Sequence, residues 1–350
     1  MVKRLAFAVP GDLSTPTGGY VYDRRMIAEL EALGWRIDLI NVGECFPWPS
    51  KDRRAAVEAR LLMVPQGSLI IVDGLALGAL PEAARRLRAN HLLVALVHHP
   101  LALETGLTPA QADILRASET AALAASKHVV VTSQATAQRL VSDYAVPGDK
   151  ITVARPGNDI VLPPARDREG LVRVLSVGAI VPRKGFDVLV AALATLGDLP
   201  WQLTIAGDRG RDPKASAQLD ADIARLKLGE RVSVLGAVSP EHLAELYAEA
   251  DIFALASRFE GYGMAYGEAV AFGLPVVGTR AGAVPDTVPP GAGILVAPDD
   301  VPAFAQALRR VIGNADERRR LAAAARAAAG KLPSWQESAK ILVGALERLA

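Results

Sequence analysis

The chain has 350 residues, of which 51% are hydrophobic, and a formal net charge of +1. This length allows two domains of ordinary size, and the near-neutral charge argues against a nucleic-acid-binding protein. Cys45 is the only cysteine, which excludes an internal disulfide and a cysteine-based zinc cluster and fits a cytoplasmic protein. No apolar run reaches the length of a membrane-spanning helix.

The first half alternates short apolar strands with helices. The expected strands are Leu5–Val9, Arg36–Val42, Ser68–Val72, His91–Val97, His128–Thr132 and Ile151–Ala154. The expected helices are Tyr20–Leu33, Lys51–Met63, Pro81–Arg88 and Ser133–Ser142. This alternation predicts a parallel sheet built from βαβ units. The basic helix Lys51–Met63 leaves peripheral contact with the inner face of a membrane open, beside the simpler interpretation of a solvated helix.

A glycine pair, Gly18–Gly19, ends the loop after the first strand. Glycines allow the backbone to approach a ligand closely, but the pair could equally form only a tight turn. The GxGxxG spacing of a dinucleotide-binding fingerprint is absent, which argues against a nicotinamide-dependent dehydrogenase.

Polar side chains follow two of the expected strands directly. Asp73 follows one strand, and His98 and His99 follow the next. Ligands of open parallel sheets bind at the carboxyl ends of the strands, so these residues are candidates for binding or catalysis. A purely structural histidine remains the alternative.

The alternation restarts after a proline-rich linker at Arg155–Arg168. The expected strands are Arg173–Val177, Gln202–Ala206, Arg231–Leu235, Ile252–Ala256, Pro275–Gly278 and Gly293–Val296. The expected helices are Phe186–Leu196, Ser216–Lys227, Pro240–Ala250, Met264–Phe272, Val301–Asn314, Glu317–Ala329 and a last one at Ser334–Ala350. The sequence therefore predicts an α/β protein with two doubly wound sheets.

The stretch Ala256–Gly273 carries two glutamates, Glu260 and Glu268, separated by a glycine-rich turn. Glu260 is expected at the tip of a strand and Glu268 inside the following helix. The amides at the start of that helix would face an anion such as phosphate, while the carboxylates would accept hydrogen bonds from sugar hydroxyls. Two solvated acids beside a glycine turn remain the alternative.

Two adjacent cations, Arg183 and Lys184, follow the first strand of the second half. At the carboxyl edge of the sheet they suit a diphosphate, whose charge they would neutralise in place of a metal. Asp208 also follows a strand, where it would cap a helix or face the ligand. Asp299 and Asp300 precede a helix and are expected to cap it. No spacing in the sequence argues for a bound metal or other cofactor.

These motifs together resemble a known family. The form EGYGMAYGEAVAFGLPVV, with Glu260 and Glu268, is similar to the Glu-x7-Glu signature of retaining GT-B glycosyltransferases of family 4, also called group 1. The segment Val177–Phe186 resembles the family's donor-phosphate loop. Val131–Leu140, Arg155–Asp159 and the Gly18–Gly19 turn match its usual layout, although RPGND stands where the family usually has an Asn-Gly pair.

The resemblance implies two Rossmann-like domains that face a cleft. Residues 1–163, with the crossing helix 334–350, would bind the acceptor, and residues 164–333 would bind a nucleotide-sugar donor. The implied activity is that of a hexosyltransferase, which moves the sugar from a UDP- or GDP-sugar with retention of configuration and without a metal. The acceptor, whether a lipid, a sugar or a small metabolite, stays open.

Site roles are also implied by the resemblance. The implied catalytic residues are His98, Glu260, Arg183 and Lys184. The implied donor-binding residues are Gly18, Gly19, Gly178, Arg183, Lys184, Gly236, Val238, Glu260, Gly263, Met264, Ala265 and Glu268. The acceptor side would use His98, His99 and Asp73. Within this set, Arg183 and Lys184 would hold the diphosphate. Glu260 would contact the sugar ring and Glu268 would bind the ribose. The nucleobase would lie near Gly236–Val238.

Two other functions remain compatible with the sequence. A nucleotide-sugar epimerase could use the same scaffold, with Asp73 and Glu104 as the obvious first-domain carboxylates. A non-enzymatic two-domain binding module would explain two α/β lobes, but not two cations and two glutamates at one sheet edge.

Overall fold

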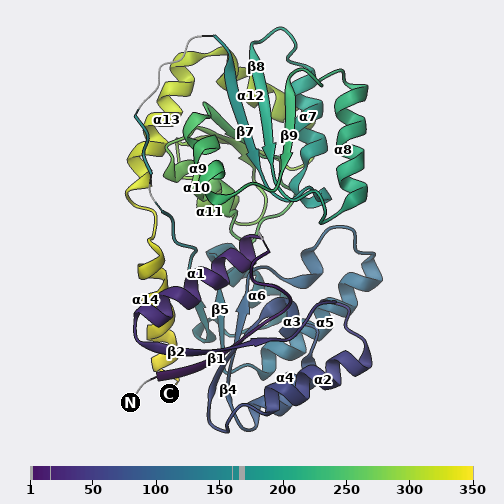
Figure 1. Cartoon of the computed structure of the whole chain (residues 1–350), viewed down its shortest axis with the longest axis vertical. Coiled ribbons are helices and arrows are strands. Elements are labelled where there is room, and N and C mark those ends of the chain that lie inside the picture. The colour runs from purple at the N-terminus through teal and green to yellow at the C-terminus, as the bar shows by residue number, and fades with distance from the viewer. Residues whose placement is uncertain (1–2, 16, 160, 165–169, 350) are drawn as a thin grey trace. The chain divides into compact units, whose positions relative to one another are not determined.

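The protein divides into two compact units (Figure 1). The computed structural model describes residues 3–15, 17–159, 161–164 and 170–349. The first unit comprises Met1–Gly157 and Pro333–Ala350, and the second comprises Asn158–Leu332. The chain thus leaves the first unit at residue 157, a few residues before the expected boundary at 163. The expected linker Arg155–Arg168 lies partly outside the described residues.

The first unit contains a six-stranded sheet of parallel strands in the order β2-β1-β3-β4-β5-β6. Its strands are β1 (Lys3–Val9), β2 (Trp35–Asn41), β3 (Leu69–Asp73), β4 (Leu92–Val97), β5 (His128–Val131) and β6 (Ile151–Val153). Its helices are α1 (Gly18–Ala32), α2 (Lys51–Leu62), α3 (Gly74–Leu77), α4 (Pro81–Arg88), α5 (Pro109–Ala125), α6 (Gln134–Tyr144) and α14 (Trp335–Glu347), with short 3₁₀ helices η1 (Leu101–Leu103) and η2 (Gly148–Lys150).

Helices α1 and α5 of this unit differ from the sequence prediction. Helix α1 begins at Gly18 rather than at Tyr20, because Thr17 caps it by accepting from the Tyr20 amide. The glycine pair therefore opens a helix instead of closing a loop. Helix α5 was not predicted at all, although Thr108 and Gln111 form a capping box at its start.

The second unit repeats the architecture with parallel strands in the order β12-β11-β10-β7-β8-β9. Its strands are β7 (Val172–Val177), β8 (Trp201–Ala206), β9 (Val232–Gly236), β10 (Ile252–Ala254), β11 (Val276–Thr279) and β12 (Gly293–Val296). Its helices are η3 (Pro182–Lys184), α7 (Phe186–Ala194), α8 (Pro213–Arg225), α9 (Pro240–Glu249), α10 (Met264–Ala271), α11 (Val284–Thr287), α12 (Val301–Gly313) and α13 (Ala315–Ala329).

The strand order of each sheet reverses at one place. In the first sheet the reversal lies between β1 and β3, and in the second it lies between β7 and β10. Loops that leave adjacent strands in opposite directions open a crevice at such a switch point, and ligands of doubly wound folds bind there. The expected α/β class with two doubly wound sheets is confirmed.

Each unit has its own apolar core. The returning helix α14 packs beside α1 of the first unit (Figure 1), where the Trp335 ring lies 6.0 Å from the Tyr22 ring. Gly157 is required at the exit from this unit, because a Cβ there would overlap the backbone of Trp335. Among the described residues, no helix is long and apolar enough to cross a membrane.

Candidate functional site

The loop after β7 is held against the neighbouring loops by glycine contacts. Gly185, which follows η3, has a φ of +65°, and a Cβ there would overlap the carbonyl oxygen of Ala256 after β10. Gly207 after β8 is equally constrained, because its Cβ would overlap the carbonyl oxygen of Gly178. These close approaches bring the β7 and β10 loops together at the switch point of the second sheet.

Glu260 lies at the centre of a buried ionic cluster at this switch point. Its side chain accepts from Lys184 Nζ at 2.6 Å, from Arg183 Nη1 at 3.5 Å and from Ser257 Oγ at 2.6 Å. Only 5% of Glu260 is exposed. Burial raises the pKa of Glu260, but the two cations and the hydrogen bonds from Lys184 and Ser257 outweigh burial and leave its pKa below the ordinary value.

Arg258 fixes the short 3₁₀ helix that carries both cations. Its guanidinium contacts Asp187 at 2.7 Å, Asp299 at 2.7 Å and the carbonyl oxygen of Pro182. Its amide donates to the carbonyl oxygen of Arg183 at 2.8 Å. The position of η3 is therefore set by one arginine that bridges three segments.

Glu268 faces a tyrosine from α9. Tyr247 donates its hydroxyl hydrogen to Glu268 Oε2 at 2.8 Å and also lies 3.2 Å from the carbonyl oxygen of Ala265. Burial raises the pKa of Glu268, although the Tyr247 hydrogen bond and the Lys184 charge oppose the rise. The helix that carries Glu268 starts after Gly263, whose φ is +86° and which offers no capping side chain. The first amides of α10, at Met264 and Ala265, thus face outward from the helix start.

Other residues of the second unit that were considered as site residues lie apart from this cluster. Gly236 ends the edge strand β9, two strands away from β7, and Val238 follows in the next loop. Asp208 accepts from the Gly210 amide at 2.7 Å and so closes a turn, whereas Asp212 caps α8. Asp300 caps α12, as predicted, while Asp299 pairs with Arg258.

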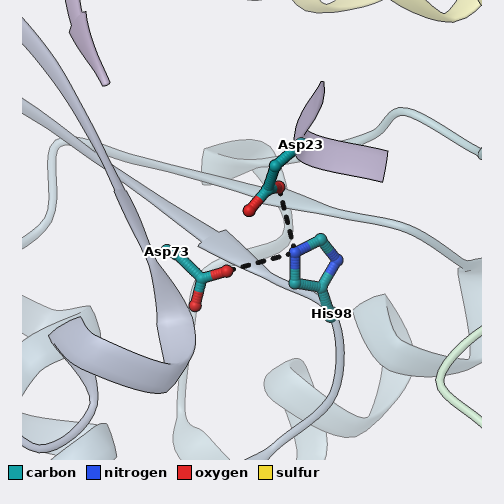
Figure 2. A group of neighbouring side chains, drawn as sticks. All are labelled: Asp23, Asp73 and His98. Atoms are coloured by element: carbon teal, nitrogen blue, oxygen red, sulfur yellow. Dashed lines mark hydrogen bonds and ion pairs between the residues drawn. The ribbon is translucent and has the colours of Figure 1, made fainter. Parts of the chain in front are cut away.

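The first unit places His98 between two carboxylates (Figure 2). His98 Nε2 lies 3.2 Å from Asp23 Oδ1 and 3.3 Å from Asp73 Oδ2. Asp73 ends β3, Asp23 projects from α1 after β1, and His98 follows β4, so the cluster lies at the switch point of the first sheet. Both aspartates are almost fully buried.

The two carboxylates and the histidine change one another's protonation. Burial lowers the pKa of His98, but Asp23 and Asp73 outweigh burial and raise its pKa to about 10. Burial raises the pKa of Asp23 to about 7, against the lowering effect of the His98 charge. Asp23 Oδ2 is buried without a hydrogen-bond partner among the described residues.

The predicted residues of the first unit come together only in part. His98 and Asp73 meet, and Gly19 packs on the imidazole, because a Cβ at Gly19 would lie 3.3 Å from His98 Cδ2. His99 instead lies 3.3 Å from Glu104, in a more exposed pair. Asp23 was missed by sequence reasoning, although an acidic residue one helical turn after the glycine pair and on the buried face of α1 was a usable signal.

Within the described part of the chain, one group of side chains has ligand atoms close enough together to hold a metal ion. It consists of Asp23, Asp73 and His98. The three atoms lie within 4.8 Å of one another. His98 Nε2 also lies within hydrogen-bond distance of both carboxylates.

A buried glutamate supports the segment that follows the histidines. Glu119 on α5 accepts from the Leu101 amide at 2.9 Å and is 1% exposed. Burial raises the pKa of Glu119 to about 8. It was not predicted because α5 itself was not predicted.

Comparison with known proteins identifies the class to which the fold belongs. Residues 164–328, which make up most of the second unit, match the family model described as glycosyl transferases group 1. The Anabaena HepE protein, solved in complex with UDP-glucose, superposes with a TM-score of 0.78 at 20% identity, covering 98% of this chain and 99% of that one. The chain therefore has the fold of the GT-B glycosyltransferases.

Two curated relatives are similar over much of the chain. The MMP α-(1→4)-mannosyltransferase of Mycolicibacterium hassiacum is 31% identical over 276 residues, covering 73% of this chain and 65% of the relative. The D-inositol 3-phosphate glycosyltransferase of Xylanimonas cellulosilytica is 33% identical over 238 residues, covering 63% and 57%. The matched part of this chain thus spans somewhat less than two thirds of each relative's length.

Proposed function

We propose that the protein is a glycosyltransferase that moves a hexosyl group from a nucleoside diphosphate sugar to a hydroxyl acceptor, with retention of anomeric configuration and without a metal. The observation that carries this proposal is the cluster of Arg183, Lys184 and Glu260 at the switch point of the second sheet. A diphosphate needs fixed cations, and a sugar ring needs a carboxylate acceptor beside them.

The comparisons support this class of reaction. One relative is named a mannosyltransferase and the other a D-inositol 3-phosphate glycosyltransferase, and the structural neighbour was solved with UDP-glucose. They favour a glycosyltransferase over an epimerase or a non-enzymatic binding module. Experiment is left to decide two points. One is whether the donor nucleotide is UDP or GDP, and the other is whether the acceptor is a lipid, a sugar or a small metabolite.

In this mechanism the diphosphate shares the two cations with Glu260. As the glycosidic bond breaks, negative charge grows on the leaving phosphate, and Arg183, Lys184 and the first amides of α10 stabilise that charge. The acceptor attacks from the leaving-group face, and a phosphate oxygen takes its proton. Because these cations act most strongly in the transition state, they raise kcat more than they improve donor binding.

The remaining residues bind and orient the donor and the acceptor. Glu260 accepts from hydroxyls of the transferred sugar, and Glu268, held by Tyr247, accepts from the ribose. The nucleobase lies near Gly236 and Val238, and His98 is the proposed catalytic residue of the first unit. Of the glycines that the family resemblance assigns to donor binding, Gly18 and Gly19 open α1, and Gly178 leaves room for the Lys184 side chain, which a Cβ there would approach to 3.1 Å.

The test is donor turnover by Arg183→Ala. We expect kcat to fall by roughly two to three orders of magnitude, as when one preorganised charge donor is removed from an active site, with a smaller change in the affinity for UDP or GDP measured by calorimetry. Arg173→Ala is the matched control, because Arg173 lies at the opposite end of β7 in a surface pair with Glu249. Unchanged turnover in Arg183→Ala would refute the phosphate role of this loop.

A further inference from the structure

A cavity of about 310 Å³ lies in the second unit at the amino ends of β10 and β11. Asp251, which precedes β10 and accepts from the Arg173 amide at 2.8 Å, lines it together with Pro275, which precedes β11. The cluster around Glu260 follows the carboxyl end of β10, so the cavity lies at the opposite end of the same sheet. Its volume falls at the lower end of the range for small-molecule sites. The cavity is therefore separate from the proposed donor site and has room for a small metabolite.

One wall of the cavity is a single face of α13, which packs against α10 (Figure 1). Arg318, Ala322 and Arg326 are spaced four residues apart and so lie along one side of this helix. Because alanine is short, the two arginines stand at the ends of a hollow. Arg319 also lines the cavity, so its lining holds, among the described residues, three arginines and one carboxylate, that of Asp251. The cavity is thus positively charged.

Two of these arginines are held in place by backbone groups. Arg318 Nη1 donates to the carbonyl oxygens of Val311 and Ile312 at 3.0 and 3.1 Å, and Arg326 Nη1 donates to that of Pro163 at 2.7 Å. Both side chains are half-buried, and within the described residues neither forms an ion pair. Buried charges are normally paired, because removing them from water is costly. Two fixed guanidinium groups with further N–H donors therefore suit an anion.

The other walls of the cavity are mainly apolar. Phe272 and Leu274 line it beside Ala248 at the end of α9. Gly273 between the two large side chains has a φ of +75°, and a Cβ there would lie 2.5 Å from Arg326 Cγ, so the absence of a side chain leaves room for the arginine stem. An apolar lining with a few fixed cations suits a ligand that has an apolar body and an acidic group. Arginine binds carboxylate and phosphate alike.

The apolar wall is connected to Glu268 through two aromatic rings. Phe272 lies one turn after Glu268 on the same helix, and its amide donates to the Glu268 carbonyl oxygen at 3.0 Å. The Phe272 ring stacks on Tyr247 with the ring centroids 5.2 Å apart, and the Tyr247 hydroxyl donates to Glu268 Oε2 at 2.8 Å. A ligand that packs on Phe272 thus acts on the ring that holds the Glu268 carboxylate.

We propose that this cavity binds a small organic anion, a phosphate monoester or a carboxylate on an apolar body, and that its occupancy is transmitted through Phe272 and Tyr247 to Glu268. The binding step depends only on the geometry of the second unit. Its consequence for the donor rests on the proposed function, in which Glu268 binds the ribose. The cavity is then a regulatory site at the end of the sheet opposite the donor.

The test is calorimetry of the whole protein with phenyl phosphate and with phenylacetate at millimolar concentration, which separates a phosphate ligand from a carboxylate ligand. We expect at least one of them to bind, while benzyl alcohol, which keeps the ring but carries no charge, does not. Arg318→Gln and Arg326→Gln should each raise the Kd about tenfold. Arg320→Gln is the matched control, because Arg320 pairs with Glu317 on the same helix outside the cavity, and it should leave the Kd unchanged. Binding of neither anion would overturn the proposal.

Ala322→Leu gives a second variant, because it fills the hollow between the arginines without removing a charge. It should abolish binding of both anions, so a folding defect in an arginine variant still leaves a test. Arg183→Ala should bind the anions as the unaltered protein does, because Arg183 lies at the other end of the sheet. Loss of binding in Arg183→Ala but not in Ala322→Leu would place the anions on the proposed diphosphate site and overturn the proposal.

The link to Glu268 has a readout of its own. The ring signals of ¹³C-labelled Tyr247, assigned by comparison with Tyr247→Phe, should shift when the anion binds in the absence of any nucleotide. Binding that leaves these signals unmoved would overturn the link. The Kd of UDP or GDP should also change about fivefold or more when the cavity is occupied. Absent nucleotide affinity beside intact anion binding would contradict the proposed function and leave the site standing, so the two failures are distinguishable.

Discussion

At the scale of single residues, the second unit depends on a buried charge pair. Lys184 and Glu260 lie 2.6 Å apart with side chains that are 14% and 6% exposed. Lys184→Met leaves Glu260 buried with only the more distant Arg183 cation and the Ser257 hydroxyl. We therefore expect a loss of about 3–5 kcal/mol in the free energy of unfolding, which is the usual effect of removing one partner of a buried pair. Chemical denaturation measures this loss.

The control for this prediction is the double variant Lys184→Met with Glu260→Gln. It removes the uncompensated carboxylate, so most of the lost stability should return while activity stays low. A double variant that is less stable than Lys184→Met would show that Glu260 contributes mainly through contacts other than this pair.

Glu119 predicts a pH effect on the stability of the first unit. Its pKa is raised to about 8 in the folded protein, whereas an unfolded glutamate has a pKa near 4.3. The folded state thus holds a proton that the unfolded state loses, so this contribution to stability is complete below about pH 4.3 and is lost as pH rises to about 8. Glu119→Gln, which still accepts from the Leu101 amide, should lessen the fall in melting temperature between pH 5 and pH 8.

Thermal unfolding monitored at both pH values checks this expectation. Glu31→Gln on the exposed face of α1 is the matched control, and it should leave the pH dependence unchanged. An equal pH dependence in Glu119→Gln and in the unaltered protein would mean that Glu119 already ionises in the folded state near its ordinary value.

At the scale of elements, the 3₁₀ helix η3 is held in place by Arg258. Arg258→Ala removes the contacts to Pro182, Asp187 and Asp299, which frees the segment that carries both proposed phosphate-binding cations. We expect kcat to fall by about tenfold, because a small displacement of a positioning group is costly, while the melting temperature changes by only a few degrees.

Arg309→Ala provides the comparison. Arg309 forms a similar two-bond pair with Asp198 in the same unit, but this pair joins α12 to the loop before β8. It should reduce stability slightly and leave turnover unchanged. Equal loss of turnover in both variants would point to general destabilisation instead of positioning of η3.

Elements differ in how far the sequence predicts them. Strands buried on both faces, such as Leu69–Asp73 and Ile252–Ala254, read as continuous apolar runs and were placed within one or two residues. Helix α5 was not predicted because only two of its buried residues, Leu115 and Leu123, are large and apolar, while the others are Glu119, Ala122 and Ala125. Its capping box at Thr108 was the readable signal, and it outweighs weak periodicity.

For the site residues too, the sequence predicts what depends on local patterns and misses the contacts that only the fold creates. Strand ends and adjacent cations are local patterns, so Arg183, Lys184 and His98 were placed at sheet edges from the sequence. Asp23 lies inside a helix, and only the fold brings it within 3.2 Å of His98. The contact of Arg183 and Lys184 with Glu260 likewise joins residues 76 and 77 positions apart, which no local pattern can specify.

At the scale of the whole molecule, each unit concentrates its buried charges at the switch point of its own sheet. The second unit places two cations around one carboxylate, and the first places one histidine between two carboxylates. Switch points leave a crevice between diverging loops, so charges there remain reachable by a ligand even though the side chains are largely buried. The two clusters thus have opposite charge balance, and the cationic one carries the proposed phosphate-binding role.

The stability of the first unit depends on the last helix, α14, because the chain returns to this unit at Pro333. Trp335 on α14 is 5% exposed, and Arg25 of α1 lies over its ring at 5.2 Å. Because its described contacts lie in the first unit, Trp335→Ala should cost about 3–5 kcal/mol there through the cavity it leaves. Hydrogen exchange should accelerate in α1, β6 and α14 while β7 and β8 keep their protection.

Ile341→Ala on the same helix is the control, because that side chain is 47% exposed and its truncation leaves no buried cavity. Exchange in this variant should match that of the unaltered protein. The loss of packing in Trp335→Ala should also disturb the position of His98, because Tyr22 contacts both the tryptophan and the imidazole. The proposed sugar transfer should therefore fall in Trp335→Ala, whereas the proposed affinity of the second unit for UDP or GDP should persist. Equal acceleration of exchange in both units would instead show that they unfold as one cooperative body.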